Sequence, residues 1–458
     1  MPSEREQAAA LLAAYGQEQL LRFYPQLSAD SRDKLIREIL SLDFELIKSI
    51  AHNGPSAAGD DAVIEPVQAY DWDKFDSGEQ RRFERKGWEL LRQGKVGALV
   101  VAGGQGSRLG HEGPKGTFDI GLPSHKSLFQ LQAERLINLS ARAGRAVPWY
   151  IMTSPDNHAE TVRFFKEHDH FGCAPDDCFF FEQAVLPALD VHGNVLLAAK
   201  DRINLAPSGN GDCFAALARS GGLADMKRRG VEWLFYYNVD NALIKVADPL
   251  FVGVAAHFNN PIATKVIEKT DPAEKVGIVC LKNGRPAVVE YTEIADSLRH
   301  EADVQGKLKY RLANLSIQLF RTDFIERHTN AQLPFHIAHK KIPFIDETGA
   351  LIAPDEPNAY KFERHHFDFF PLADHITVLL MKRESEFAPI KNKAGEDSPE
   401  SARRMLFGLH RSWLLAAGVP AERLKDREIE ISPLVSYAGE GLEHFKPELD
   451  PKPEPGRS

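Results

Sequence analysis

The sequence predicts an α/β fold with a mixed, mainly parallel sheet, flanked by a helical N-terminal region and a small C-terminal domain. Short apolar runs recur from residue 95 onward, such as "VGALVVAG", "VPWYIMTS", "CFFFEQ" and "WLFYYNVD". Segments with helical periodicity lie between them, and this alternation is typical of a parallel sheet. The pattern differs before residue 93 and after residue 383.

The N-terminal region, residues 1–92, is expected to be helical. Apolar residues recur at three- and four-residue spacing across 4–50, and a serine precedes the second stretch as a helix cap. The turn-rich linker "HNGPSAAGDD" at 52–61 separates this part from a charged helix predicted at 79–93.

The core is expected at 93–383, with helices at 127–142 and 157–168 between its strands. The C-terminal domain, 384–445, begins irregularly and continues as a helix at 398–417. It ends in "EIEISPLVSYAGEGLE", which is interpreted as a strand with a glycine-rich turn. The proline-rich, charged tail 446–458 is expected to be disordered.

The composition is that of a globular chain and argues against several classes of protein. Of the 458 residues, 43% are hydrophobic and 26% are charged, and the net charge is −9. A negative charge disfavours broad binding to nucleic acid or to an anionic membrane, although a few local cations suffice for a small anionic ligand. The apolar runs fall well short of the roughly 20 residues of a membrane span. Four scattered cysteines and an N-terminus without a signal-peptide core favour reduced thiols and a cytoplasmic location.

The stretch "VAGGQGSRLGHEGPKGTF" at 101–118 follows a predicted strand and is the strongest candidate for a binding site. Ligands of open parallel sheets bind at the carboxyl ends of the strands. Glycines let backbone N–H groups approach a nucleotide and its phosphates, and this loop has several: Gly103, Gly104 and Gly106. Arg108 offers a planar fork for phosphate oxygens, and Lys115 adds a second cation. The loop therefore indicates a triphosphate whose pyrophosphate end leaves; the alternative is a surface turn with solvated charges.

Two familiar phosphate-binding motifs do not match this loop. A Walker A loop needs G-x-x-x-x-G-K-[ST], but here the lysine follows Pro114 and the threonine comes two residues later. A dinucleotide fingerprint needs G-x-G-x-x-G, and Leu109 stands at the position of the third glycine. An NAD-binding dehydrogenase is therefore the weakest interpretation.

The longer run from Gly103 to Leu136 resembles the signature of eukaryotic-type UDP-N-acetylhexosamine (UDP-N-acetylglucosamine) pyrophosphorylases, in the UDP-sugar pyrophosphorylase (UDPGP type 1) family. Further blocks similar to those of the family follow in family order over residues 95–445, among them "FFFEQAVLPAL", "LAPSGNGDCFAAL", "YYNVDNALIKVADPLFVG" and "LPFHIAHKKIPFID". Such an ordered series is hard to reach by chance. The resemblance implies a Rossmann-like, GT-A-like nucleotidyltransferase core.

The resemblance also implies which residues contact the base. Gln183 matches a uracil contact of the family, and its carboxamide offers both a donor and an acceptor for the base edge. Gly209, in the turn "PSGNG", would let the backbone pass close to the uracil. Taken alone, these residues are also compatible with a hydrogen-bonded strand end and a connecting turn.

Two residues are matched to the phosphates and the metal. Asp240 resembles the family's magnesium-binding aspartate, since Mg²⁺ takes one or two carboxylates besides phosphate oxygens and water. Lys391, in "FAPIKN", would reach the phosphates. Taken alone, Asp240 is compatible with a helix cap, and Asp248 in the following turn is expected to be one.

The residues matched to the sugar come from separate blocks of the chain: Asn210, Gly277, Glu290, Asn314, His365 and Phe367. Glu290 can accept from sugar hydroxyls, and Asn314 can bond a hydroxyl and an acetamide. The family has an aromatic–valine–Phe-Asp run where this chain has "HHFD", so His365 replaces a phenylalanine. A polar imidazole there is expected to alter selectivity if it packs on the sugar.

The implied reaction joins UTP and N-acetylhexosamine 1-phosphate into UDP-N-acetylglucosamine or UDP-N-acetylgalactosamine and releases pyrophosphate. The sugar phosphate oxygen would attack the α-phosphorus in line, with Mg²⁺, Arg108, Lys115 and Lys391 neutralising charge and no protein nucleophile. A UDP-glucose or broad-specificity UDP-sugar pyrophosphorylase remains open, as does a catalytically silent nucleotide-sugar-binding protein. Neither nucleic acid nor membrane is an expected partner, and a monomer or weak homodimer is expected.

Overall fold

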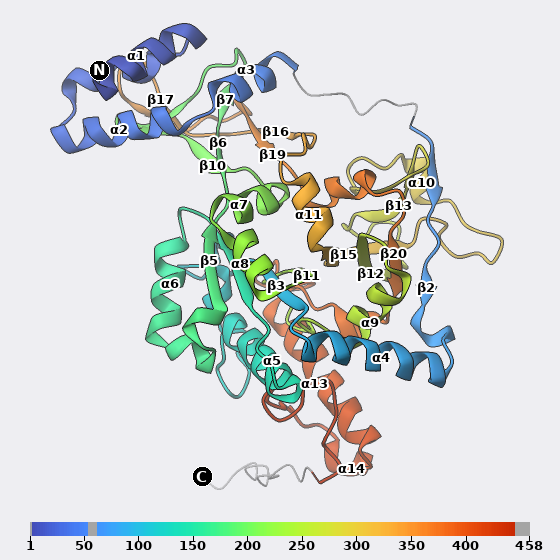
Figure 1. Ribbon diagram of the computed structural model, residues 1–458. Helices are drawn as coiled ribbons and strands as arrows, with labels where there is room; N and C mark the ends of the chain where they lie inside the picture. The colour runs from blue at the N-terminus through green and yellow to red at the C-terminus, as the bar shows by residue number, and fades with distance from the viewer. Residues whose placement is uncertain (1, 54–61, 445–458) are drawn as a thin grey trace, which may run out of the picture.

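The computed structural model describes residues 2–53 and 62–444, and a large mixed sheet forms its centre (Figure 1). Five of the seven neighbouring pairs along its main path are parallel, which confirms the predicted α/β class. The path runs through β2 (Tyr70–Asp71), β20 (Thr377–Leu380), β12 (Ile262–Glu268), β15 (Leu312–Arg321), β11 (Trp233–Asn238), β3 (Val96–Val101), β4 (Trp149–Thr153) and β5 (Cys178–Glu182). A side branch adds β1 (Ile64–Pro66), β13 (Ile278–Lys282) and β14 (Arg285–Val289).

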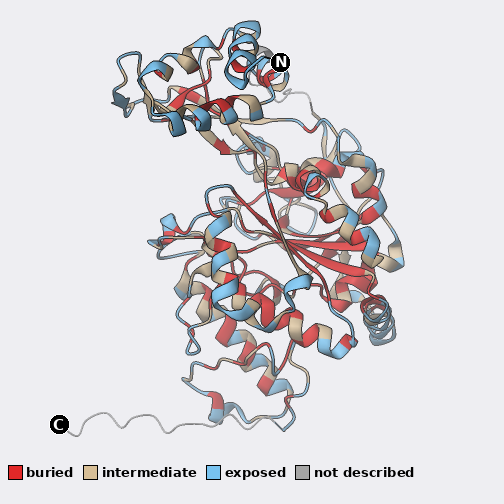
Figure 2. Cartoon of the chain, turned by 60° about the vertical axis from the view of Figure 1, so that its left-hand side comes forward, coloured by how far each residue is buried: buried red, intermediate tan, exposed pale blue. Residues whose placement is uncertain are grey.

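Successive side chains of the central strands enter two different cores, one on each face of the sheet. In β11, Phe235 belongs to one core and Tyr236 to the other, and in β3 Val100 and Leu99 divide in the same way. This period of two is what a strand buried on both faces requires. Figure 2 accordingly shows the sheet as a buried layer between helices.

Two groups of helices cover the two faces. The first face packs against α4 (Ser77–Arg92), α5 (Leu128–Ala143), α6 (His158–Glu167) and α9 (Pro249–Phe258). The second packs against α7 (Cys213–Arg219), α8 (Gly222–Arg229) and α11 (Thr322–His328), and the short α10 (Asp296–Arg299) lies beyond β14. Three of these helices begin at side-chain caps: Asp76 accepts from the Glu79 N–H, Ser127 from the Gln130 N–H, and Asp248, as predicted, from the Leu250 N–H.

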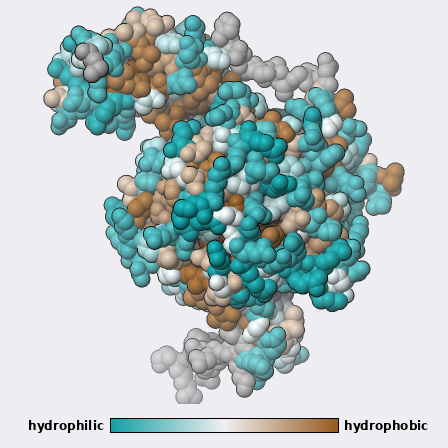
Figure 3. Space-filling view, viewed as in Figure 1, coloured by the Kyte–Doolittle hydropathy of each residue, from teal (hydrophilic) through white to brown (hydrophobic). Residues whose placement is uncertain are grey.

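The first three helices form a small lobe, at the upper left of Figure 1: α1 (Glu4–Tyr15), α2 (Ala29–Ser41) and α3 (Phe44–Asn53). They share a core with residues from the middle of the chain, for example Leu12 and Ile39 with Leu197 and Phe362. The same lobe holds the short strands β6 (Val185–Pro187), β7 (Leu189–Asp190), β8 (Leu197–Ala199), β9 (Arg202–Ile203), β10 (Leu205–Pro207), β16 (His336–Lys340), β17 (Phe344–Ile345), β18 (Leu351–Ile352) and β19 (Ala359–Glu363). Figure 3 shows that apolar residues also reach the surface on the underside of this lobe.

The charged helix predicted at 79–93 is present as α4, but residues 62–76 before it differ from the helical N-terminal region expected there. Their strands β1 and β2 pair with β13 and β20 of the central sheet, and α4 packs closely on α9. A Cβ atom at Gly87 or Gly253 would lie 1.7 Å from a backbone oxygen of the other helix, so glycine permits this contact. Strands of two or three residues are too short to show a period in the sequence. Residues 54–61 of the predicted linker and the predicted tail 446–458 lie outside the described residues.

The C-terminal part contains α12 (Arg383–Glu386), α13 (Pro399–Ala416) and α14 (Ala421–Leu424). The strand predicted at 428–443 is wrong, because this segment pairs with no strand. Its alternating Ile429 and Ile431 are buried against α13, which explains the misleading pattern. The Ile431 N–H donates to the His410 imidazole at 3.1 Å, so a side chain of α13 takes the place of a neighbouring strand.

Candidate active site

The carboxyl ends of four neighbouring parallel strands bring the predicted nucleotide-binding residues together. The glycine loop follows β3, Asn157 comes shortly after β4, Gln183 directly follows β5, and Asp240 lies just beyond β11. These strands are adjacent in the sheet, so their ends meet at one edge. This is the edge at which open α/β sheets bind their ligands.

The glycine loop is held in shape by its own backbone. The Gly106 N–H donates to the Gly113 oxygen at 2.9 Å, and the Lys115 N–H donates to the Gly104 oxygen at 3.0 Å. From outside the loop, the fully buried Asn157 side chain donates to the Ala102 oxygen at 2.9 Å. Sequence reasoning missed Asn157, although an asparagine closely following a predicted strand was a usable signal.

Gln183 lies directly against the glycine loop. A Cβ atom at Gly103 would be 2.5 Å from the Gln183 Nε2, so the glycine makes room for this carboxamide. Gln183 is only 7% exposed, and its carboxamide makes no hydrogen bond within the described residues. A buried polar group of this kind needs a partner, and a base edge could supply one.

Lys115 and Asp240 form an ion pair at 3.0 Å, and both side chains are about four-fifths buried, at 17% and 21% exposed. Arg108, on the same loop, is exposed and makes no ion pair or hydrogen bond within the described part of the chain. Its guanidinium is therefore free for a ligand. One predicted cation, Lys115, therefore contacts the predicted metal ligand directly, whereas Arg108 has no contact of this kind in the chain as described.

The segment that carries Lys391 is bonded to the segment that carries Asp240. The Ile390 N–H donates to the backbone carbonyl oxygen of Asp240 at 3.0 Å. The Lys391 ammonium lies 3.3 Å from the Asp397 carboxylate. The Asn241 side-chain amide also donates to the backbone carbonyl oxygen of Glu386 at 2.7 Å. These bonds bring the end of β11 and residues 386–391 together, across about 150 residues of sequence.

A buried charge cluster supports this junction. The Lys265 ammonium is fully buried and lies 2.6 Å from Asp248 and 2.8 Å from Glu386. Lys245 adds a second cation 2.6 Å from Glu386. Two lysines and two carboxylates balance one another, which is the condition under which buried charges are tolerated.

The turn at Gly209 links the base side of the site to the predicted sugar side. Gly209 has φ +84°, and a Cβ atom there would lie 2.3 Å from the Arg364 oxygen, so another residue would be both strained and clashing. Asn210 accepts from the His366 N–H at 2.9 Å. The turn is therefore packed on the segment that carries His365.

The other predicted sugar residues also meet. A Cβ atom at Gly277 would lie 2.9 Å from the Glu290 carboxylate, and the Asn314 N–H donates to the Gly277 oxygen at 2.8 Å. Burial and the charge of Glu293 raise the pKa of the Glu290 carboxyl. The positive charges of Lys391 and of a nearby histidine oppose this rise, so the sugar side lies within electrostatic reach of the phosphate side.

That histidine is His336 of β16, which sequence reasoning missed. Its ring nitrogens lie 3.0 Å from Asp368 and 3.3 Å from Glu293. Burial lowers its pKa, but hydrogen bonds to both carboxylates outweigh this and raise the pKa of His336 to about 10. The ring contacts His365 at a centroid distance of 4.4 Å, and burial together with this cation lowers the pKa of His365. His365 in turn stacks on Phe367 at 4.8 Å, so a neutral imidazole and a phenyl ring form one wall.

The site offers few protein ligands for a metal ion, so the substrate would have to provide the others. Among the described residues, no group of three or more His, Cys, Asp or Glu side chains could hold a metal ion. Asp240 supplies a carboxylate beside Lys115, and the buried Asn238 side-chain oxygen, two residues earlier, has no hydrogen-bond partner within the described residues. This donor set fits Mg²⁺, which completes its shell with phosphate oxygens and water, rather than zinc or calcium.

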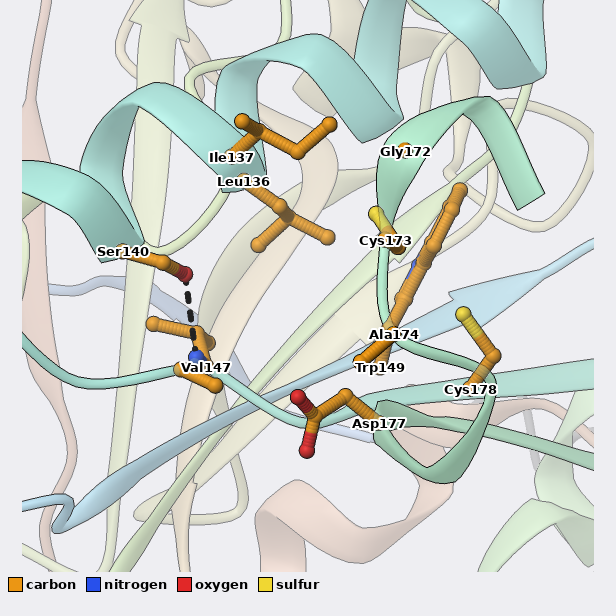
Figure 4. A pocket seen from close by; sticks show the side chains of 11 residues that line it. Leu136, Ile137, Ser140, Val147, Trp149, Gly172, Cys173, Ala174, Asp177 and Cys178 are labelled. Carbon is orange, nitrogen blue, oxygen red and sulfur yellow. Dashed lines mark hydrogen bonds between the residues drawn. The ribbon is translucent and has the colours of Figure 1, made fainter. Parts of the chain in front are cut away.

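An apolar cavity elsewhere in the core is not part of this site. It has a volume of about 160 Å³ and is lined by Leu136, Val147, Trp149, Cys173 and Cys178 (Figure 4). Trp149 and Cys178 are the first residues of β4 and β5, so the cavity lies at the opposite ends of the strands from the glycine loop.

A glycine loop with two cations, opposite a carboxylate at the carboxyl edge of a mainly parallel sheet, defines this chain as an α/β nucleotidyltransferase. It belongs to the family described as UTP–glucose-1-phosphate uridylyltransferase, whose sequence model matches residues 52–446. None of the helices described is long and apolar enough to cross a membrane.

Curated relatives match nearly the whole chain. The mouse UDP-N-acetylhexosamine pyrophosphorylase-like protein 1 is 38% identical over 97% of this chain and 95% of its own length. The Saccharomyces cerevisiae UDP-N-acetylglucosamine pyrophosphorylase is 39% identical over 95% of this chain and 93% of its own. Among solved structures, the Trypanosoma brucei uridine diphosphate N-acetylglucosamine pyrophosphorylase has a TM-score of 0.84 at 30% identity, covering 97% of this chain and 95% of that one. The predicted family is therefore confirmed.

Proposed function

We propose that the protein is a uridylyltransferase that makes UDP-N-acetylglucosamine and pyrophosphate from UTP and N-acetylglucosamine 1-phosphate. One observation carries this proposal, the order of the strands in the sheet. Gln183, whose carboxamide is unpaired within the described residues, follows β5 at one side, Asp240 lies just beyond β11, and Asn314 lies in β15, the next strand, where Gly277 and Glu290 join it. A single edge of the sheet thus offers groups for a base, for phosphates and for a sugar, in that order. The relatives that match over nearly their whole length carry names for this activity.

Catalysis would consist of positioning and charge neutralisation. The sugar phosphate oxygen attacks the α-phosphorus of UTP in line, and the bond to the pyrophosphate leaving group breaks. Arg108 and Lys115 on the glycine loop would hold the departing phosphates, and Lys391 would hold the incoming one. Fixed cations of this kind act where charge develops in the transition state.

Asp240 is the proposed protein ligand of Mg²⁺. Asp240 would hold the ion, which when bound would supply positive charge close to the phosphates. The Asp240 carboxylate is ion-paired with the Lys115 ammonium at 3.0 Å. Because Lys115 is also a proposed phosphate contact, the carboxylate becomes available to the metal when the ammonium turns to the substrate.

Selectivity for an acetamido sugar is proposed to come from Asn314 and Glu290. Asn314 is 8% exposed, and its oxygen already accepts from the Ser316 N–H and the Gln318 side chain, so its amide hydrogens remain for a ligand. A site built to bond a polar group rejects an analogue that lacks it, because buried polar atoms are then left unpaired. His365, in place of a phenylalanine, adds a polar edge to this wall.

The experiment is a panel of sugar 1-phosphates assayed for pyrophosphate release with saturating UTP and Mg²⁺. N-acetylglucosamine 1-phosphate is expected to exceed glucose 1-phosphate in kcat/KM by roughly ten- to hundredfold, which corresponds to about 1–3 kcal/mol for an unpaired polar group. Asn314→Ala should narrow this ratio, and Asn260→Ala, which removes an amide bonded to Thr377, is the matched control. A ratio near one in the unmodified protein would indicate a broad-specificity enzyme.

A second panel tests the base. UTP is expected to be preferred over CTP, TTP and ATP, since the Gln183 carboxamide satisfies a uracil edge. Equal rates with UTP and ATP would contradict the uracil assignment. The absence of pyrophosphate release with every pair of substrates would support a silent binding protein. A reducing, cytoplasmic location is part of the proposal and is favoured by the free state of all four cysteines.

A further inference from the structure

A separate hollow of about 480 Å³ is lined by residues of α13 and of the segment after α14. The helices α13 and α14 lie in the lower part of Figure 1. Its lining contains four arginines, Arg403, Arg404, Arg411 and Arg427, and two glutamates, so its net charge is +2. None of the residues assigned to the active site lines it.

The arginines of this hollow have no acidic partners among the described residues. Arg403 donates to the Ile120 carbonyl and Arg411 to the Arg427 carbonyl, at 2.9 Å in the second case, while the guanidinium groups of Arg404 and Arg427 make no hydrogen bond within that part of the chain. Arg229, by contrast, is paired with both Asp177 and Asp225. In the described part of the chain, the two glutamates of the lining, Glu400 and Glu428, form no ion pair with these arginines and offset only half of their charge, so the net positive hollow is suited to an anion.

A glycine in the middle of α13 gives a second, independent indication. Gly408 is an exposed interior residue of a helix that runs from Pro399 to Ala416, where glycine is less favourable than alanine. A Cβ atom at Gly408 would meet nothing within 4 Å, so packing within the chain does not require glycine there. Arg404 and Arg411 lie four residues before and three residues after it, on the same side of the helix. The missing side chain therefore leaves the floor of the hollow open between two guanidinium groups.

We propose that this hollow binds a small molecule that carries a phosphate group, at a site distinct from the substrate site. Guanidinium groups bind phosphate oxygens through paired, charge-assisted hydrogen bonds, and four of them suit a dianion. The volume falls in the range of small-ligand pockets, so it accommodates a phosphate ester as well as free phosphate.

The hollow adjoins both cation-bearing segments of the active site. Arg403 bonds the Ile120 carbonyl, five residues after Lys115, and its guanidinium lies 2.9 Å from the position of a Cβ atom at Gly121. The N-cap of α13, Ser398, directly follows Asp397, the partner of Lys391. The hollow thus lies close in the chain to both lysine-bearing segments, although none of the residues assigned to the active site lines it.

Calorimetric titration of the full chain with inorganic phosphate, glucose 6-phosphate and adenosine 5′-monophosphate tests the proposal. At least one probe is expected to bind saturably, and Arg404→Gln with Arg427→Gln should weaken this binding at least tenfold. Arg423→Gln, a nearby exposed arginine outside the hollow, is the matched control and should leave it unchanged. Tighter binding of an ester than of free phosphate identifies an ester as the ligand, and equal binding identifies phosphate itself; both support the site.

Two further variants separate this site from the active site. Lys115→Ala should leave the binding of the probe intact, whereas Gly408→Leu, which fills the floor while keeping every arginine, should weaken it at least tenfold. Because binding is measured without turnover, the result does not depend on the proposed reaction. The proposal is overturned if no probe binds saturably, if Arg423→Gln weakens binding as much as the double variant, or if binding is lost in Lys115→Ala and kept in the double variant. Should Gly408→Leu not fold, the arginine variants alone decide.

Discussion

Arg108→Ala separates the chemistry of the glycine loop from its stability. The Arg108 side chain is exposed and has no partner within the described residues, so its removal should change the free energy of unfolding by less than about 0.5 kcal/mol. If the guanidinium stabilises charge on the departing pyrophosphate, kcat should fall by roughly 10²- to 10³-fold, or about 2.7–4 kcal/mol of transition-state stabilisation. Such a separation of stability and rate is the signature of a group that acts only on the substrate.

The assay is pyrophosphate release under saturating UTP and sugar phosphate, alongside urea denaturation of each variant. Arg108→Lys keeps the charge but loses the planar fork, so it should recover only part of the rate. Arg85→Ala removes an exposed arginine from α4 and should leave both measurements unchanged. An Arg108→Ala enzyme within tenfold of the unmodified one, or about 1.4 kcal/mol, would refute the role assigned to this side chain.

Three further substitutions test other parts of the site. Asp240→Asn should abolish the saturable dependence of turnover on Mg²⁺, because a neutral amide is a poor ligand for a hard cation; an unchanged titration curve would remove this residue from the metal site. Gly209→Ala, with its Cβ 2.3 Å from a backbone oxygen, should destabilise the protein by about 1–3 kcal/mol more in urea than Gly230→Ala, which has a similar positive φ but open space; equal losses would show that no close contact exists. His336→Gln should remove a pH-dependent stabilisation: the folded pKa of about 10 lies above the usual histidine pKa of 6.5, so the contribution is complete below about pH 6.5 and is lost as the pH rises through 10. Parallel stability profiles of the two proteins from pH 6 to pH 10 would contradict the charged state of this histidine.

The loop chemistry could be predicted from the sequence because it is local. Tight turns restrict which residues can occupy them, so Gly103, Gly106, Arg108 and Lys115 form a recognisable series within a few residues of a strand end. The period of two in the buried strands and the cap at Asp248 are local for the same reason. The fold class and the family were accordingly predicted from the sequence and are confirmed.

The convergence of distant residues was decided by tertiary packing. Nothing near Gln183 in the chain indicates that it lies against Gly103, and nothing near Lys391 indicates that Ile390 bonds to Asp240; these contacts depend on which strands are neighbours in the sheet. The ion pairs of His336 with Glu293 and Asp368 also join separate segments, and no sequence motif predicts them.

The errors in the sequence-based description have the same physical origin. The alternating segment at 428–431 looked like a strand, but a strand exists only where a neighbour supplies hydrogen bonds, and here His410 of α13 supplies one instead. Conversely, the two residues of β2 carry no strand pattern and still extend the sheet, because β20 offers them a free edge. Local sequence determined the turns, caps and strand periods of this protein, because backbone sterics act within a few residues. Which segments pair with one another was decided by the packing of the whole chain. The polar groups of one segment find their partners in segments far away in the sequence, and no short motif contains both.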